Sequence, residues 1–200
     1  MLFFLSFSKI NFEILRFNVK IFLGVLMIYF IRHGETEYNK DARFQGHLDI
    51  PLNKVGVLQA QTALEKSKQL NFDKIYCSPL SRARQTAEII NTHHNVKLIE
   101  DDRLKEIYMG SLQGRMFKDL SDEEKRLAFS TPEYFGGETH EQLCSRVISF
   151  FKEIENSTEN ILIVSHGGIY RALYKYLNNL DSLEFNLKPI PNAEIVLLKH

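Results

Sequence analysis

Two histidines stand at matching places in the sequence. His33 follows an apolar run and precedes Gly34, and His166 follows another apolar run and precedes Gly167. Ligands of open α/β sheets bind beyond the carboxyl ends of the strands, where a glycine lets the backbone approach closely. We therefore expect His33 and His166 to share one site, although a single histidine beside a glycine is more often structural.

Arginines accompany this pair. Arg32 immediately precedes His33, and Arg82 and Arg84 follow a third apolar run. Ser81 is expected to cap the helix that begins there, which would place both arginines near its positive end, where phosphate binds. Because a guanidinium offers a planar fork of donors and stays charged, Arg32 and Arg82 fit a phosphate pocket. Arg84 fits better as a solvated helix residue.

This set suits phosphoryl transfer. The charged form of a histidine is disfavoured between two guanidinium groups, so His33 is expected to present a neutral imidazole nitrogen that can attack phosphorus. The leaving alcohol needs a proton, and Glu106, just before the glycine-bearing loop of residues 108–114, is the candidate donor. Taken alone, Glu106 is a surface carboxylate, and Asn39 and Gln45 are turn residues.

No metal is expected in this chemistry. The seven histidines form no His-Glu-x-x-His helix or comparable ligand cluster, and the adjacent His93 and His94 fall in an expected loop. The two cysteines, Cys77 and Cys144, are far apart, so neither a disulfide framework nor a thiolate zinc site is indicated. A reducing, cytoplasmic location fits this cysteine usage best.

The composition indicates one globular domain. Two hundred residues, 44% of them apolar, allow a proper core but leave no room for a second full domain. With 25 basic and 25 acidic side chains the formal net charge is zero. Neither nucleic acid nor an anionic membrane is therefore indicated as a partner, and any anion site must be local.

From residue 27 onward, short apolar runs alternate with helical patterns, which is typical of an α/β domain. We expect a mixed sheet, with residues 104–137 forming loops and short helices over it. The expected strands are residues 27–31, 74–77, 96–99, 160–165 and 194–198. The expected helices are residues 53–69, 81–91, 139–155 and 167–178.

Residues 1–26 form a separate apolar extension. Four charged side chains interrupt it, namely Lys9, Glu13, Arg16 and Lys20. The longest uncharged run, residues 21–31, is too short to cross a bilayer, so no integral membrane span is expected. The extension is interpreted as a gene-model extension before a natural start at Met27, as a peripheral or packing helix, or as a targeting segment.

Together these motifs resemble the histidine phosphatase superfamily, which contains cofactor-dependent phosphoglycerate mutases, fructose-2,6-bisphosphatases and α-ribazole phosphatases. The likeness covers most of residues 27–200. Its hallmark, Arg-His-Gly on the first strand, is present at residues 32–34 and is extended by residues 35–39. The similar supporting segments are residues 78–87 with the second arginine, 104–106 with the acid, and 165–168 with the second histidine.

The resemblance implies a three-layer α/β/α sandwich with a mainly parallel sheet, phosphoglycerate mutase-like, and no cofactor. It makes His33 the phosphorylated nucleophile, and Glu106 the proton donor and later the base for water. It assigns the phosphate pocket to Arg32, Arg82 and His166. Further contacts to the phosphoryl group or the substrate are implied for Asn39, Gln45, Gly46 and the backbone N–H of Gly167.

Within this group, hydrolysis of a small phosphorylated metabolite is favoured over mutase action. Mutases are typically longer than the 174 residues from Met27 to His200, and they carry extra basic residues that hold a bisphosphate. Here the basic residues between Glu106 and Gly137 lie among acids. Size and loop sequence look closest to α-ribazole and broad-specificity phosphatases. A phosphoglycerate mutase and a non-catalytic phospho-ligand-binding module remain as alternatives, and a homodimer is left open.

Overall fold

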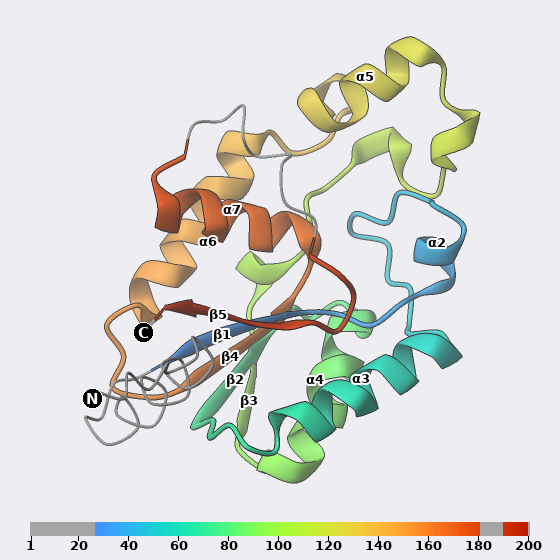
Figure 1. The fold of residues 1–200 in the computed structure, drawn as a ribbon. Coiled ribbons are helices and arrows are strands. Elements are labelled where there is room, and N and C mark those ends of the chain that lie inside the picture. The colour runs from blue at the N-terminus through green and yellow to red at the C-terminus, as the bar shows by residue number, and fades with distance from the viewer. Residues whose placement is uncertain (1–26, 181–189, 200) are drawn as a thin grey trace, which may run out of the picture.

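Five strands form one mixed sheet in the computed structural model, which describes residues 27–180 and 190–199 (Figure 1). The strand order is β3-β2-β4-β1-β5; the first four strands are parallel, and β5 pairs with β1 in the antiparallel sense. Each strand lies within one residue of its predicted position. The strands are β1 Ile28–Arg32, β2 Lys74–Cys77, β3 Lys97–Glu100, β4 Ile161–Ser165 and β5 Ile195–Lys199.

Side chains of β1 alternate between the two faces of the sheet, and each face is covered by a pair of helices. Ile28 and Phe30 join the core under α6 and α7, whereas Tyr29 and Ile31 join the core over α3 and α4. The two helix layers lie on opposite sides of the sheet (Figure 1), so the predicted three-layer sandwich is confirmed. The four helices are α3 Lys54–Ser67, α4 Ser81–His94, α6 His140–Ile154 and α7 Gly167–Asn178.

Helix α4 is longer than predicted. It continues through His93 and His94, for which we expected a loop, and ends where Asn95 adopts a left-handed conformation with φ of 49°. The ring centroids of His94 and Phe72 lie 4.6 Å apart, and Nε2 of His94 lies 2.9 Å from the hydroxyl of Ser67. The loop prediction was wrong because tertiary contacts stabilise a last turn whose polar sequence does not favour a helix.

The expected cap of α4 is also wrong. Leu80, not Ser81, is the N-cap residue, and it makes no side-chain cap. The carboxylate of Asp49, from a distant loop, instead accepts hydrogen bonds from the N–H and the hydroxyl of Ser81 at 2.6 and 2.8 Å. An anion supplied by tertiary structure therefore satisfies the start of α4, and no local pattern could reveal it.

Residues 104–137 form loops and short helices, as expected. The longest helix in this stretch, α5, follows a capping box made by Ser121 and Glu124. The stretch contains η2 Gly110–Leu112, η3 Phe117–Asp119, α5 Asp122–Ser130 and η4 Pro132–Phe135. Two further short elements lie earlier in the chain: α2 Glu37–Lys40 follows β1, and η1 Asp102–Leu104 leads into the stretch. It has a small core of its own, made of Phe44, Met109, Leu112, Leu120 and Ala128. In Figure 1, α5 stands well away from the sheet.

Residues 1–26 lie outside the described residues, so the interpretations of the apolar extension stay predictions. Within residues 27–180 and 190–199, no helix has both the length and the apolar character that crossing a bilayer requires.

Candidate active site

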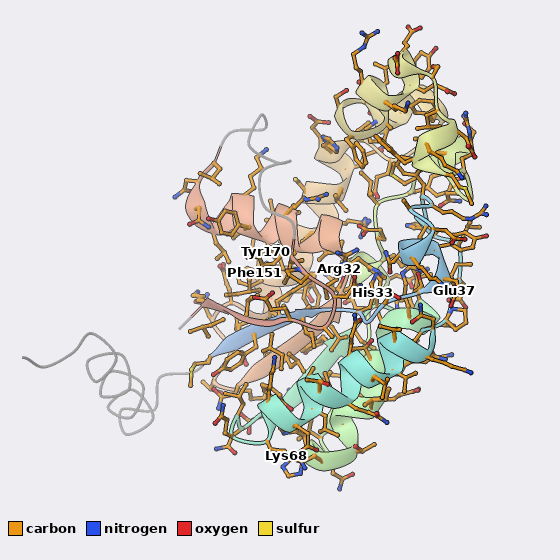
Figure 2. All side chains as sticks on the ribbon, turned by 45° about the vertical axis from the view of Figure 1, so that its right-hand side comes forward. Arg32, His33, Glu37, Lys68, Phe151 and Tyr170 are labelled. Atoms are coloured by element: carbon orange, nitrogen blue, oxygen red, sulfur yellow. The ribbon has the colours of Figure 1, made fainter. Side chains whose placement is uncertain are left out.

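The two histidines meet because β1 and β4 are parallel neighbours. Arg32 pairs in register with Ser165, and the N–H of His33 donates to the Ser165 carbonyl at 2.9 Å. The rings of His33 and His166 then lie 5.1 Å apart between centroids, at 61°. Both side chains are buried, at 2% and 0% exposure. Figure 2 shows Arg32 and His33 where β1 ends, below α7.

One hydrogen bond defines which nitrogen of His33 can react. Nδ1 of His33 lies 2.7 Å from the carbonyl oxygen of Gly34, and a carbonyl can only accept. Nδ1 therefore carries the proton, and Nε2 keeps its lone pair. Gly34 is needed here because a Cβ at this position would overlap the backbone of Gly56 at the start of α3.

The environment keeps His33 neutral. Burial is the main cause that holds the pKa of His33 well below its usual range, and the guanidinium groups of Arg82 and Arg32 lower it further. The sequence predicted only the effect of the two cations. Burial likewise holds the pKa of His166 well below its usual range, and its Nε2 lies 2.8 Å from the hydroxyl of Ser78.

Arg82 is the largest fully buried side chain in the described part of the protein. Its Nη1 and Nη2 donate to the carbonyls of Leu48 and Gly46, each at 2.8 Å, which fixes the guanidinium plane. Burial lowers the pKa of Arg82 to about 10, so the group remains a cation at neutral pH. The protein thus holds a dry, oriented positive charge beside His33.

Orphaned donors gather at the same place. Arg32 donates from Nη1 to the carbonyl of Ile190 at 2.9 Å, but its Nε has no partner. Across residues 27–180 and 190–199, the buried side-chain nitrogens and oxygens without a hydrogen-bond partner are Arg32 Nε, Arg82 Nε, His166 Nδ1 and Arg171 Nε. Buried polar atoms are normally satisfied, so the three guanidinium N–H donors in this set indicate a site for an anion with several oxygens.

The carboxylate of Glu106 is held against the start of α7. The N–H of Gly168 donates to its Oε1 at 3.0 Å and to its Oε2 at 3.3 Å, and the N–H of Ile107 donates to Oε1 at 2.9 Å. A Cβ on Gly168 would overlap Oε1, so only glycine permits this approach. Glu106 also attracts both Arg32 and Arg82 electrostatically.

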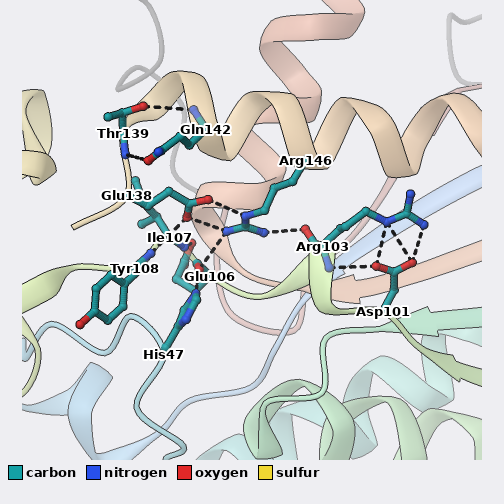
Figure 3. A network of polar contacts seen from close by, with 10 residues as sticks. All are labelled: His47, Asp101, Arg103, Glu106, Ile107, Tyr108, Glu138, Thr139, Gln142 and Arg146. Atoms are coloured by element: carbon teal, nitrogen blue, oxygen red, sulfur yellow. Dashed lines mark hydrogen bonds and ion pairs between the residues drawn. The ribbon is translucent and has the colours of Figure 1, made fainter. Parts of the chain in front are cut away.

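The backbone of Glu106 is fixed by a second set of contacts (Figure 3). Its carbonyl accepts hydrogen bonds from Nε2 of His47 at 2.7 Å and from Nη2 of Arg146 at 3.1 Å. Arg146 also donates to the Arg103 carbonyl at 2.6 Å and to both carboxylate oxygens of Glu138 at 2.6 and 2.8 Å. The side chain and the main chain of Glu106 therefore have separate anchors.

Asn39 and Gln45, the predicted substrate contacts near α2, are both hydrogen-bonded to Thr36. Thr36 donates its hydroxyl proton toward the amide oxygens of Asn39 and Gln45, which lie 3.2 and 3.0 Å away. Since both oxygens are engaged, the side-chain NH₂ groups of Asn39 and Gln45 are the groups a ligand can use. Gly46 adopts φ of 52° and offers its carbonyl to Arg82.

Helix α7 begins at Gly167 without a side-chain cap, because its N-cap residue, His166, makes no capping hydrogen bond. The first-turn N–H groups of a helix lack internal partners and attract anions. The N–H of Gly168 donates to Glu106, so the ligand contact expected for the N–H of Gly167 stays a prediction.

These residues surround one cavity of about 530 Å³. Eight of the nine predicted site residues line it: Arg32, His33, Asn39, Gln45, Gly46, Arg82, Glu106 and Gly167. The ninth, His166, is fully buried and reaches the site through its contact with His33. Arg84 does not line the cavity and is half exposed, 3.8 Å from Glu88.

Among the cavity-lining residues that sequence reasoning did not single out are Arg171 and His140. Arg171 follows Gly167 by one helical turn, and this spacing could have placed it on the same side of α7. His140 had no such signal, because only the tertiary fold brings the start of α6 to the cavity. In the described part of the chain, no three His, Cys, Asp or Glu side chains are grouped to hold a metal ion.

The chain has relatives of known family. It is 35% identical over 159 residues to phosphoglycerate mutase-like protein 4 of Arabidopsis thaliana, across 74% of this chain and 69% of that protein. It is 34% identical over 176 residues to the metal-independent phosphoserine phosphatase of the same plant, across 82% and 74%. The α-ribazole phosphatase of Shigella flexneri has the same fold, with a TM-score of 0.74 at 26% identity over 86% of this chain and 89% of that one.

The family assignment covers nearly the whole described structure. Residues 28–200 match the family described as the histidine phosphatase superfamily (branch 1). The resemblance drawn from the Arg-His-Gly motif is therefore confirmed. The chain belongs to the histidine phosphatase superfamily, and it is an enzyme of the phosphoric monoester hydrolase type.

Proposed function

We propose that this enzyme hydrolyses a phosphate monoester through a phosphohistidine intermediate on His33, with Glu106 as the proton donor. The observation that carries the proposal is the hydrogen bond from Nδ1 of His33 to the Gly34 carbonyl. It leaves Nε2 unprotonated in a cavity that also contains the guanidinium groups of Arg32 and Arg82. A neutral imidazole nitrogen beside such cations is a suitable nucleophile for a phosphoryl group.

In the first step, Nε2 of His33 attacks phosphorus, and the bond from phosphorus to the leaving oxygen breaks as the N–P bond forms. Arg32, Arg82 and the N–H of Gly167 stabilise the negative charge on the other three oxygens. Glu106 gives its proton to the departing oxygen, so that a neutral alcohol leaves.

In the second step, water attacks phosphorus from the side that the alcohol vacated. The carboxylate of Glu106 accepts a proton from this water, and the N–P bond breaks to release inorganic phosphate. His33 recovers the lone pair on Nε2, and Glu106 is again protonated for the next turnover. No metal takes part in either step.

The decisive test is to trap the covalent phosphohistidine intermediate. The full-length protein, mixed briefly with a ³²P-labelled aryl phosphate and quenched in base, should carry an acid-labile phosphate, and peptide mapping should place it on His33. His33→Ala should remove both the label and turnover, whereas His93→Ala, an exposed histidine at the end of α4, should keep both. Full activity in His33→Ala would overturn the mechanism, and label on His33 would exclude a non-catalytic binding module.

A mutase is the main alternative, because one relative is named for phosphoglycerate mutase. Two basic side chains of residues 104–137 that could hold a second phosphate are already paired: Arg115 with Glu124 at 2.7 Å, and Lys125 with Asp122 at 3.5 Å. Supplying 3-phosphoglycerate and measuring isomer formation against release of inorganic phosphate distinguishes the two reactions. We expect phosphate release to dominate.

The substrate we propose is a small phosphorylated metabolite, since a cavity of about 530 Å³ is the size of an ordinary small-molecule site. The likeness to an α-ribazole phosphatase supports a place among the phosphatases rather than the mutases. Cys77 and Cys144 are free thiols, which fits a cytoplasmic enzyme.

A further inference from the structure

The cavity extends well past the charged groups that surround His33. Its remaining lining is largely apolar and comes from the stretch after α2 and from residues 104–137. The apolar side chains from these two segments are Ala42, Phe44, Ile107, Met109, Phe117, Ala128, Phe129 and Pro132. The cavity therefore has a polar side and an apolar side. We call the polar side at the strand ends the floor; it is made of Arg32, His33, Arg82, Glu106 and Gly167, with His166 packed against His33.

Three phenylalanines, Phe44, Phe117 and Phe129, form what we call the aromatic wall. Their ring centroids lie 5.6 to 6.2 Å apart in every pairing, and the rings are tilted at 37° to 49°. Phe44 is buried, but Phe117 and Phe129 are 37% and 44% exposed. Both also line the cavity, so part of their apolar surface faces the site. Large exposed rings at a binding cavity mark a place for an apolar ligand group.

The aromatic wall is tied to the chain that carries Asn39 and Gln45. The N–H of Phe117 donates to the Ala42 carbonyl at 2.9 Å, and the N–H of Phe44 donates to the Arg115 carbonyl at 3.1 Å. Arg115 in turn holds α5 through both carboxylate oxygens of Glu124. These bonds connect η3 and α5 to the rim of the floor, so the wall is formed before any substrate binds.

Charge on this side of the cavity does not suit a polyanionic alcohol. Arg43 lines the cavity, but it is engaged by Asp41 at 3.3 Å, by the Gly114 carbonyl and by the ring of Tyr38. Arg171 is close enough to Arg32 for its positive charge to lower the pKa of Arg32, so it belongs to the polar side of the cavity. The aromatic wall itself contributes no charged group.

We propose that the aromatic wall binds the leaving alcohol of the substrate, and that this alcohol carries an aromatic or similarly flat apolar group. This inference rests on the proposed phosphatase reaction, which places the phosphoryl group on the floor. The alcohol then extends from the floor past Glu106 toward Phe117 and Phe129. The substrate class is thus phosphate monoesters of ring-bearing alcohols rather than of small polar ones.

The test compares two esters whose alcohols have similar acidity but differ by one ring, namely 2-phenylethyl phosphate and ethyl phosphate. For the full-length enzyme we expect kcat/KM to favour the phenylethyl ester by about tenfold or more. Phe117→Ala and Phe129→Ala should each lower kcat/KM for the phenylethyl ester about threefold to tenfold and leave ethyl phosphate nearly unchanged. Tyr134→Ala, an exposed aromatic that does not line the cavity, is the matched control and should change neither.

Binding separates this inference from the reaction on which it rests. The same two groups, offered as the non-hydrolysable 2-phenylethylphosphonate and ethylphosphonate, should bind with the same preference in calorimetry, and both phenylalanine variants should reduce it. Equal affinities, or a loss that is the same for both ligands, would overturn the aromatic-wall inference even if His33 is phosphorylated. A ring preference in binding without label on His33 would instead retain the wall and overturn the proposed reaction.

Discussion

The floor and the aromatic wall of the cavity are built in opposite ways. On the floor, polar and charged side chains are buried: His33 is 2% exposed, and Arg82 and His166 are fully buried. On the wall, apolar side chains are exposed: Phe117 and Phe129 show 37% and 44% of their surface. Burying polar groups in the floor lowers the free energy of unfolding but holds the reactive groups in one orientation. The wall instead leaves apolar surface exposed, where a ligand can bind. The floor therefore sets the reaction, and the wall sets which alcohol leaves.

Glu106 lines the cavity beside the cationic groups of the floor, and its replacement should have the largest effect after that of His33. Glu106→Gln keeps an oxygen that can accept from Gly168 but supplies no proton, so kcat for ethyl phosphate should fall about a hundredfold or more. The nitrophenolate of p-nitrophenyl phosphate leaves without a proton, so that substrate should be affected much less. Glu123→Gln, an exposed carboxylate of α5, is the control. An equal loss for both substrates would remove Glu106 from the proton-transfer step.

Arg146 should act on the floor through Glu106, without touching the substrate. Its pair with Glu138 is mostly buried, at 20% and 14% side-chain exposure, and it holds the Glu106 carbonyl (Figure 3). Arg146→Gln should lower kcat for ethyl phosphate about tenfold with little change in KM, because the proton donor is no longer held in place. Arg146→Lys should restore part of the loss, since lysine keeps the charge but not the fork of donors.

Comparing two substrates with different leaving groups shows whether Arg146 positions Glu106 or only stabilises the fold. If Arg146 works through Glu106, p-nitrophenyl phosphate should lose less activity than ethyl phosphate, as in Glu106→Gln. Arg103 provides the matched control, because its guanidinium is paired with Asp101 and Glu153 and does not reach Glu106. Arg103→Gln should show no dependence on the leaving group, and the same absence in Arg146→Gln would mean that its role is only structural.

The floor could be predicted from the sequence because simple rules place it. Short, continuous apolar runs locate β1 and β4, and parallel neighbours bring His33 and His166 to one edge of the sheet. The contacts that orient these groups come from distant segments and carry no local signal. Asp49 at the start of α4, Ser78 beside His166 and His140 in the cavity were missed for this reason. Arg171 differs from them, because its spacing of one helical turn from Gly167 was a local signal that was not used.

The wall could not be predicted for a different reason. Phe44, Phe117 and Phe129 are separated by long stretches of sequence, and 3₁₀ turns in residues 104–137 have no strong hydrophobic period. The sequence indicated only that this region would form loops and short helices. Which rings converge depends on tertiary bonds such as that from Phe117 to Ala42, and these exist only after the chain has folded.

Burial of the floor should also make stability depend on pH. The folded-state pKa values of His33 and His166 lie well below that of an unfolded histidine, mainly because of burial. Below about pH 6.5 the unfolded chain therefore binds more protons, so stability is full above that pH and is lost as the pH falls. Between pH 7.5 and 5.5 each histidine should contribute a loss of unfolding free energy of at most about 1.4 kcal/mol, the limit set by titration of the unfolded histidine.

Urea unfolding of His33→Asn at these two pH values measures that contribution. The loss of unfolding free energy on acidification should be smaller than in the unmodified enzyme, by at most about 1.4 kcal/mol, whatever the variant's stability at pH 7.5. His93→Asn, at an exposed position, should keep the full loss. A pH dependence that His33→Asn leaves intact would mean that burial of His33 does not set it.

The smallest effect on stability is expected for the variants of the aromatic wall. Phe117→Ala and Phe129→Ala should each lower the free energy of unfolding by less than about 1.5 kcal/mol, because both rings already expose a large part of their surface. Phe30→Ala, which empties a fully buried position in the sheet, should cost about 3 kcal/mol or more. The wall variants should show the same cost at pH 7.5 and 5.5, since no titrating group is removed. If Phe117→Ala lowered the free energy of unfolding as much as Phe30→Ala, the ring of Phe117 would be part of the hydrophobic core. The contrast between a buried polar floor and an exposed apolar wall would then be wrong.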